Sequence, residues 1–167
     1  KARSPGSDRQ PPHDTQVYAY YAEMATASIL GASGYSGQET LDRILAHPEL
    51  ELVALGSDSL AGEPASALDP RLGRLDLPTF VANDNALEAG ADVVFCCLGH
   101  ERSAGLVVPS ADTVVVDLSG AHRLADAAAY EDWYGFEHPR PVELANWSYA
   151  LPELAPPAGP LIANPGC

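Results

Sequence analysis

The chain of 167 residues has the length of one ordinary domain, and its 46% hydrophobic and 19% charged residues exclude a disordered acidic chain or a collagen-like fibre. No apolar run reaches the ~18 residues that a membrane span requires, so we expect no membrane partner. Nine Lys and Arg against 23 Asp and Glu give a net charge of −14. Without a cluster of positive charge, a nucleic-acid partner is also not expected.

The first 24 residues differ in composition from the rest of the chain. Residues 1–15 are polar and rich in Pro, Ser and Asp, which is typical of disorder. Met24 is the single methionine, and an ordered pattern begins two residues later. We therefore expect residues 1–24 to be a disordered or non-native tail, with a native flexible arm as the alternative, and a domain at residues 25–167.

From residue 25 onwards, short apolar segments alternate with segments of helical spacing. Strands are predicted at residues 26–31, 50–55, 79–82, 92–98, 113–118 and 161–163. Helices are predicted at residues 37–46, 86–89, 102–108 and 126–133. Valine-rich strands joined by short helices are typical of parallel strands buried on both faces. The order predicts an α/β fold: a doubly wound, mostly parallel, Rossmann-like sheet.

A glycine-rich turn, GASGYSG at residues 31–37, follows the first strand and opens the first helix. Glycines there permit a tight turn and a close backbone approach, and the helix start presents N–H groups to a pyrophosphate. This context predicts a dinucleotide site, with a glycine-rich turn that binds no ligand as the alternative. The expected cofactor-binding residues of this turn are Gly31, Ser33, Gly34, Tyr35, Ser36 and Gly37.

The end of the second strand carries Ser57 and Asp58, where such domains contact the adenosine ribose. Asp58 could accept hydrogen bonds from both ribose hydroxyls, which favours NAD, because an aspartate repels the extra phosphate of NADP. The alternative is that Asp58 is a solvated loop charge.

Three cysteines, two of them adjacent, do not form the framework of a secreted disulfide-rich protein, and we expect a cytoplasmic protein. The absence of a C-x-x-C pair makes a metal site unexpected. Cys96 and Cys97 lie in an apolar run, where we expect core packing on opposite faces of a strand. His100, just beyond that strand, is expected to be a loop histidine without a chemical role.

Two further segments follow strands near the end of the chain. Arg123 is one of few positive side chains, so it is a candidate for binding an anionic substrate, with a salt bridge to Asp117 or Asp126 as the alternative. Cys167 follows the turn Asn164-Pro-Gly, where a helix N-terminus would stabilise its thiolate. The alternative is an ordinary turn with an idle cysteine.

Five stretches together resemble the N-acetyl-γ-glutamyl-phosphate reductases of arginine biosynthesis. In chain order they are GASGYSG (31–37), DLSGAHRL (117–124), YEDWYGFEH (130–138), YALPEL (149–154) and NPGC (164–167). The resemblance covers residues 26–167. The family is similar in fold and chemistry to aspartate-semialdehyde and glyceraldehyde-3-phosphate dehydrogenases.

The resemblance implies NADPH-dependent reduction of an acyl phosphate, N-acetyl-γ-glutamyl phosphate, to the semialdehyde and phosphate. Cys167 would be the nucleophile that forms a thioester, and Ser119, Arg123 and Asn164 would contact the substrate. A cytoplasmic homo-oligomer is implied as well. Family members continue about as far again, with the general base in that second half. We therefore expect these 167 residues to be an N-terminal half that is inactive alone.

Two other functions stay open beside this one. The acyl-phosphate reductase of carrier-linked lysine biosynthesis has the same motifs, and a non-catalytic nucleotide-binding module would require the match at Cys167 to be vestigial. The cofactor is expected to be NADP by resemblance, while Asp58 leaves NAD open.

Overall fold

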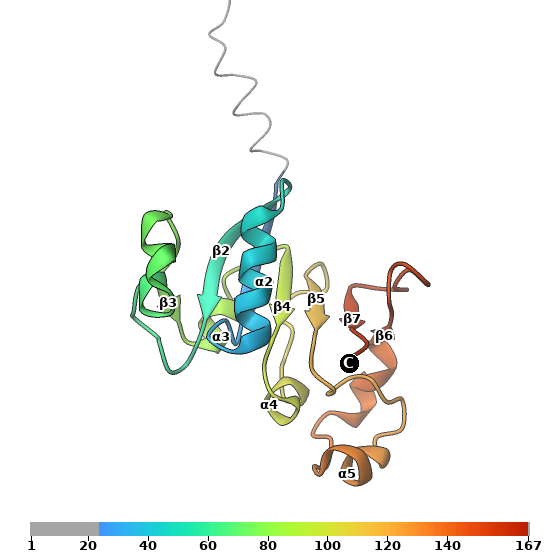
Figure 1. The fold of residues 1–167 in the computed structure, drawn as a ribbon. Helices are drawn as coiled ribbons and strands as arrows, with labels where there is room; N and C mark the ends of the chain where they lie inside the picture. Colours follow the sequence, from blue (N-terminus) through green and yellow to red (C-terminus); the bar gives the residue numbers. More distant parts are fainter. Residues whose placement is uncertain (1–23, 167) are drawn as a thin grey trace, which may run out of the picture.

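Seven parallel strands form one sheet in the computed structural model, which describes residues 24–166 (Figure 1). In chain order they are β1 (Ala25–Leu30), β2 (Leu50–Gly56), β3 (Phe80–Val81), β4 (Val93–Cys96), β5 (Val114–Asp117), β6 (Ser148–Tyr149) and β7 (Leu161–Ala163). The strand order is β3-β2-β1-β4-β5-β7-β6, and all neighbours pair in parallel. The predicted doubly wound parallel sheet is confirmed. Apart from Met24, the predicted tail lies outside the described residues, as does Cys167.

Apolar side chains leave the central strands toward both faces of the sheet. Along β4, Val94 and Cys96 pack into one core cluster, whereas Phe95 and Cys97 pack against the other. Parallel strands that are covered on both sides need this continuous apolar pattern rather than an alternation. The expectation that the two adjacent cysteines face opposite sides of the sheet is therefore confirmed.

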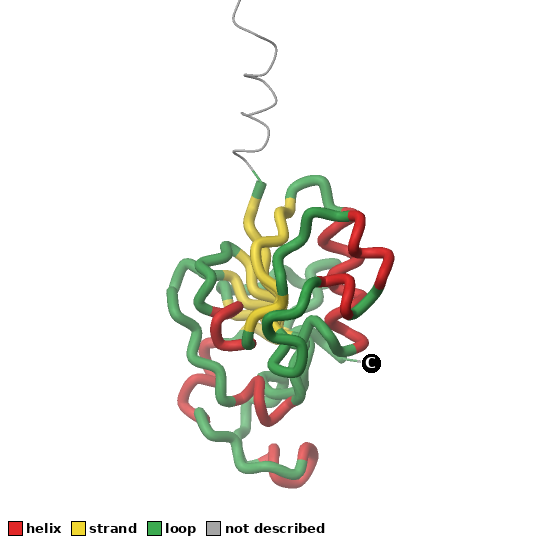
Figure 2. The backbone as a smooth tube through the Cα atoms, turned by 90° about the vertical axis from the view of Figure 1, so that its left-hand side faces the viewer, coloured by secondary structure: helices red, strands yellow, loops and turns green. Residues whose placement is uncertain are grey.

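Helices lie on both sides of the layer of strands, as Figure 2 shows from the edge. The helix α2 (Tyr35–Ala46) covers one face, where Leu41 and Ile44 join the core cluster of β1 and β2. The short 3-10 helices η1 (Ala65–Ala67) and η2 (Pro70–Arg74) pack on the same side. On the other face, α3 (Asn83–Leu87) contributes Ala86 and Leu87.

A third core cluster is formed by the long segment between β5 and β7, together with Ala104, and it holds this segment in place. It is built around the fully buried ring of Tyr130, with Phe136 and Leu144. The helices of this region are α4 (His100–Ala104), α5 (Ala129–Tyr134) and η3 (Pro141–Asn146). This cluster supports the loop after β5, which carries several of the predicted site residues.

The helix boundaries differ from the predictions at three places. The helix expected at residues 102–108 is α4, which starts at His100 and ends at Ala104, because Gly105 follows as its C-cap and the chain then leaves the helix. The helix expected at 86–89 is α3 and begins at Asn83. The helix expected at 126–133 begins at Ala129, and the Asp126 carboxylate accepts the Ala128 N–H just before it.

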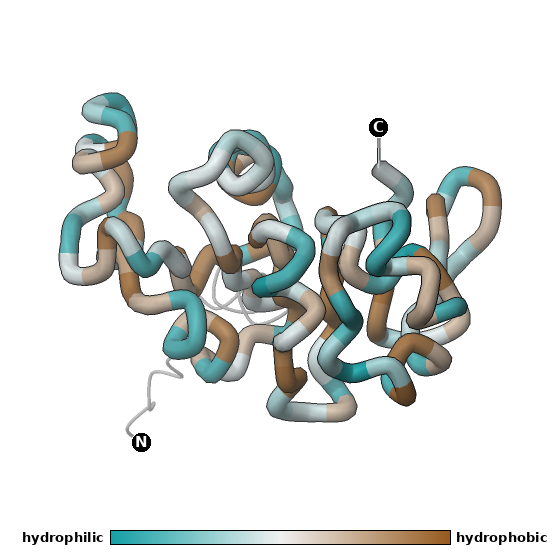
Figure 3. Tube along the Cα trace, turned by 90° about the horizontal axis from the view of Figure 1, so that it is seen from below, coloured by the Kyte–Doolittle hydropathy of each residue, from teal (hydrophilic) through white to brown (hydrophobic). Residues whose placement is uncertain are grey.

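One strand was not predicted at all. The two residues of β6 pair with Ile162 and Ala163 of β7, and a two-residue strand has no periodicity to detect. Hydrophobic and hydrophilic stretches alternate along the whole described chain (Figure 3). Within residues 24–166, no helix combines the length and the apolar character needed to cross a membrane.

The face that α2 turns toward the sheet can be tested with two leucines of that helix. Leu41 is 2% exposed and Leu45 is 38% exposed, so Leu41→Ala should cost about 2–5 kcal/mol of unfolding free energy and Leu45→Ala under about 1 kcal/mol. Urea unfolding of both variants measures the difference. Equal losses would contradict this assignment of the buried face.

Candidate functional site

The glycine turn lies at the carboxyl edge of the sheet, between β1 and β4. The chain leads from β1 to β2 in one direction along the sheet and from β4 to β5 in the opposite direction, and α/β sheets bind ligands in the crevice at such a switch point. Four residues separate Leu30, the last residue of β1, from Tyr35, the first residue of α2, so the N-terminus of α2 faces this crevice. The predicted site is therefore placed where the fold favours a dinucleotide.

Two of the three glycines are required by the protein itself. Gly31 has φ +75°, and a Cβ there would lie 2.6 Å from the carbonyl oxygen of Cys97. A Cβ on Gly37 would overlap the carbonyl oxygen of Gly31. These positions let α2 pack closely against the ends of β1 and β4, whether or not a ligand binds.

At position 34, neither the backbone angles nor the packing of the protein requires a glycine. It is the N-cap of α2 with φ −76° and ψ 169°, a conformation open to any residue, and its nearest Cβ contact would be at 3.4 Å. It makes no side-chain cap, and Tyr35 beside it is 94% exposed. Residue 34 therefore places no side chain over the first amides of α2, which have no partner inside the helix.

Hydroxyl groups gather beside this turn at the end of β2. The hydroxyls of Ser33 and Ser57 lie 2.8 Å apart, and Ser59 lies 3.2 Å from Ser57. Ser57 is buried, whereas Ser59 is exposed. This arrangement brings the predicted residues Ser33 and Ser57 together across two loops.

Asp58 is exposed, but one of its oxygens is engaged. Its Oδ1 accepts the backbone N–H of Asn83 at 2.9 Å. This bond, a side-chain bond from Asn83 and the charge of Arg102 hold the pKa of Asp58 below its ordinary value. Asn83 was missed as a site residue because only the sheet order places it beside β1 and β2.

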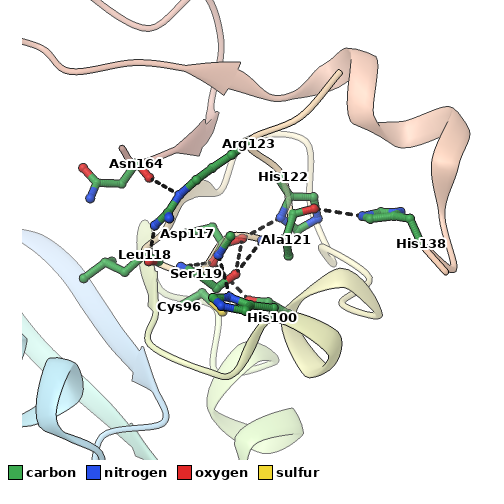
Figure 4. A network of polar contacts seen from close by, with 12 residues as sticks. Cys96, His100, Asp117, Leu118, Ser119, Ala121, His122, Arg123, His138 and Asn164 are labelled. Atoms are coloured by element: carbon green, nitrogen blue, oxygen red, sulfur yellow. Dashed lines mark hydrogen bonds and ion pairs between the residues drawn. The ribbon is translucent and has the colours of Figure 1, made fainter. Parts of the chain in front are cut away.

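The carboxyl end of β5 carries a second polar cluster, built around a buried carboxylate (Figure 4). Asp117 is 0% exposed and accepts hydrogen bonds from the Ser119 N–H and hydroxyl, the Ser103 hydroxyl and His122 Nδ1, the last at 2.6 Å. Burial raises the pKa of Asp117, but the hydrogen bond and charge of His122, with the two bonds from Ser119, outweigh it and bring the pKa below its ordinary value.

This cluster shapes the loop that leads to Arg123. The hydroxyl of Ser119 donates to Asp117 and accepts the Ala121 N–H, so the predicted substrate residue Ser119 is buried and holds the loop. His100 Nδ1 accepts the Gly120 N–H at 2.8 Å. His100 is thus the first residue of α4 and supports the loop after β5. The prediction that His100 lies in a loop is wrong.

The ring of His122 is enclosed by aromatic groups. It stacks on Trp147 at 3.7 Å between ring centroids and meets His138 edge-on at 5.7 Å. His138 Nε2 donates to the Ala121 carbonyl, and burial lowers the pKa of His138. A neutral His138 and the stacked Trp147 keep the His122–Asp117 pair out of water.

Arg123 holds the turn that ends the described chain. Its Nε donates to the Asn164 carbonyl at 2.9 Å and its Nη2 to the Leu118 carbonyl at 2.8 Å (Figure 4). A Cβ on Gly166 would overlap the guanidinium group of Arg123. The salt bridge to Asp117 or Asp126 that was the alternative for Arg123 is not formed. The Arg123 charge therefore lies directly before position 167.

The strand β7 delivers this turn to the same edge of the sheet. The Asn164 N–H donates to the Asp117 carbonyl at 2.9 Å, which continues the pairing of β5 and β7. The Asn164 side chain donates to the Pro165 carbonyl. Ser119, Arg123 and Asn164 thus lie at the same edge of the sheet, and their contact with a substrate stays a prediction. In residues 24–166, no three His, Cys, Asp or Glu side chains form a group that could hold a metal.

Residues 26–159 match the family described as the semialdehyde dehydrogenase NAD-binding domain. The chain belongs to this family. Its glycine turn and the segment after β5 both lie within the matched residues. The resemblance that the motifs indicated is confirmed at this level.

Most of the similar curated proteins carry the same enzyme name. The chain is 41% identical over 149 residues to an N-acetyl-gamma-glutamyl-phosphate reductase of Acidothermus cellulolyticus, and 44% over 147 residues to one of Dehalococcoides mccartyi. It is also 41% identical over 149 residues to a protein of Thermomicrobium roseum named for LysW-L-2-aminoadipate 6-phosphate reduction. These matches cover 84–86% of the chain but 42% of each relative, so the chain spans about two fifths of their length.

A solved structure shares the fold. The aspartate semialdehyde dehydrogenase of Candida albicans, solved with NADP, superposes with a TM-score of 0.51 at 21% identity, covering 86% of this chain and 42% of that one. At this identity the likeness bears on the fold alone.

The buried Asp117 makes the stability of this family member depend on pH. A carboxyl with a depressed folded-state pKa stabilises the fold fully above its unfolded pKa of about 3.9, and this contribution is lost as the pH falls through the folded value. Asp117→Asn should therefore cost about 3 kcal/mol at pH 7 and less at pH 3. Urea unfolding at both pH values measures this, with the exposed Asp112→Asn as a control that should change little. A loss independent of pH would contradict the assignment.

Proposed function

We propose that this chain is the dinucleotide-binding part of an NADPH-dependent reductase that converts N-acetyl-γ-glutamyl phosphate to the semialdehyde and phosphate. The names of the relatives support this reaction, and the motifs of the chain agree with it. The observation that carries the proposal is the glycine turn at the switch point of the sheet. Within the protein, neither the backbone angles nor the packing requires a glycine at position 34.

The residues at the turn fit a dinucleotide. Free amides at the start of α2 and the space over Gly34 suit a pyrophosphate, which gains from the helix N-terminus. Ser33, Ser57 and Ser59 offer hydroxyls to the ribose or its phosphate. When bound, NADPH supplies the hydride that reduces the acyl group.

Cys167 is proposed as the nucleophile of the reaction. Its thiolate attacks the acyl carbon, the bond from that carbon to the phosphate oxygen breaks, and a thioester forms as phosphate leaves. Cys167 lies outside the described residues, and the argument rests on what precedes it. Arg123 places a positive charge beside Gly166, where it would favour a thiolate and a leaving phosphate.

Asn164 and Arg123 act together in this proposal. The carbonyl of Asn164 orients the guanidinium through Nε, while Nη1 has no described partner within residues 24–166. That N–H face could receive an anionic oxygen of the substrate. We also propose a cytoplasmic location, because the three cysteines do not form the framework of a secreted disulfide-rich protein, and, on the family resemblance, a homo-oligomer.

A substitution at Gly34 separates cofactor binding from folding. Gly34→Ala meets no obstacle in the protein, so the melting temperature should stay within error, whereas the added methyl should lower affinity for NADPH about tenfold or more by occupying the pyrophosphate space. Calorimetric titration of the chain measures the affinity. Gly159→Ala is the control, because an added Cβ at Gly159 would meet nothing within 4 Å. Unchanged affinity of Gly34→Ala would contradict the site.

Thiol alkylation tests the nucleophile. Burial and the Asp117 charge raise the pKa of the Cys96 thiol to about 12, and burial raises that of Cys97, so neither should react at neutral pH. In the full-length protein, iodoacetamide at pH 7 should therefore modify Cys167 first, as seen by peptide mass spectrometry. Cys167→Ser should abolish acyl-phosphate reduction. Turnover by Cys167→Ser would overturn the proposed chemistry.

The choice of acyl phosphate needs its own assay. The relative named for LysW-L-2-aminoadipate 6-phosphate is as similar as the first reductase, at 41% identity over 149 residues. Comparing kcat/KM of the full-length protein for the two acyl phosphates decides between them, and we propose that N-acetyl-γ-glutamyl phosphate is preferred.

A further inference from the structure

Asn83 connects two loops at the carboxyl edge of the sheet. It is the first residue of α3, and it is 5% exposed between the end of β2 and the glycine turn. Its side-chain oxygen accepts the Gly31 N–H at 2.8 Å, and its own backbone N–H donates to Asp58 Oδ1 at 2.9 Å. Asp58, Asn83 and Gly31 are thus linked in series by two hydrogen bonds.

The orientation of the Asn83 amide follows from these contacts. The Gly31 N–H can only donate, so the oxygen of the amide must face it and the NH2 group must point elsewhere. The carboxylate of Asp58 accepts the backbone N–H of Asn83, the first residue of α3, and so fixes the place from which the side-chain oxygen reaches Gly31. Removal of this carboxylate would free the start of α3, and with it the Asn83 side chain, to shift.

Gly31 is the residue of the turn that depends on this contact. Its backbone has φ +75° and packs against the Cys97 carbonyl. If Asn83 turned away, the Gly31 N–H would lose its partner in a half-buried position, which costs free energy. The Gly31 carbonyl in turn accepts the Gly34 N–H at 3.0 Å, so the position of Gly31 sets that of Gly34 over the first turn of α2.

We propose that Asp58 is a positioning residue that acts through Asn83 on the glycine turn, and that it sets the affinity for both dinucleotides without selecting between them. This inference rests on the proposed dinucleotide site and deepens it. It differs from direct contact of Asp58 with the ribose, in which the carboxylate would accept the 2′-hydroxyl of NADH and repel the 2′-phosphate of NADPH.

The experiment measures the affinity of NADH and of NADPH separately, by calorimetric titration of the chain. The variants are Asp58→Ala, Asn83→Ala and the double variant, with Asp58→Asn as a milder change that keeps one acceptor oxygen. We expect Asp58→Ala and Asn83→Ala each to weaken both dinucleotides about tenfold, which corresponds to one lost hydrogen bond, with the NADH-to-NADPH ratio unchanged. Asp58→Asn should lose less at the same ratio.

The double variant shows whether the two residues act as one unit. If Asp58 works through Asn83, the double variant should lose no more affinity than Asn83→Ala alone, because the contact with Gly31 is already absent. Losses that add would overturn the serial arrangement. Weaker NADH binding with unchanged or tighter NADPH binding in Asp58→Ala would show direct ribose contact and overturn the proposal, as would no change for either.

Amide hydrogen exchange of Gly31, followed by NMR without any dinucleotide, separates this inference from the proposed function. We expect Gly31 to be protected in the parent chain and to exchange about tenfold faster in Asp58→Ala and Asn83→Ala. Asp84→Ala is the matched control. Asp84 lies beside Asn83 in α3, but its carboxylate accepts from Arg102. If the parent chain bound neither dinucleotide, the proposed site would be wrong, while this exchange would still decide the link. Unchanged exchange in Asp58→Ala would overturn it.

Discussion

Every backbone amide in the loops at the carboxyl edge of the sheet must find an acceptor, and this requirement organises the site. The first amide after β2, β4, β5 and β7 donates to a carbonyl of a neighbouring strand, whereas the Gly31 N–H after β1 donates to the side chain of Asn83. Further along, Asp58 accepts the Asn83 N–H, His100 accepts the Gly120 N–H, and Asp117 accepts the Ser119 N–H. Side chains therefore connect the glycine turn to α3 and the loop after β5 to α4.

The two halves of the edge meet this requirement by different means. Around the glycine turn the groups are small and partly exposed, which leaves the crevice open at Gly34. Around Asp117 a buried charge is surrounded by four hydrogen bonds and by the stacked rings of His122 and Trp147. The first half can admit a ligand, while the second holds Arg123 and the turn before Cys167 rigidly at its border.

How much of this could be predicted from the sequence depends on how local each signal is. The sheet and the glycine turn followed from the alternation of apolar strands and helices and from GASGYSG, because those signals lie within a few residues of one another. The role of Asn83 could not be predicted, because its partner Gly31 is 52 positions away and is brought near only by the pairing of β1 with β2 and of β2 with β3. Arg123 was found as a scarce cation, but its partners are carbonyl groups, which carry no residue signature.

The net charge of the chain bears on where the proposed sites could hold anions. The net charge is −14, and a dinucleotide and an acyl phosphate both add negative charge. Within residues 24–166, four arginines are ion-paired with carboxylates of the chain itself: Arg43, Arg71, Arg102 and Arg140. Arg123 instead donates to two neutral carbonyls, so its charge is not cancelled by a partner. The proposed anion sites therefore fall at two places where a carboxylate does not cancel the positive potential, the start of α2 and the guanidinium beside Gly166.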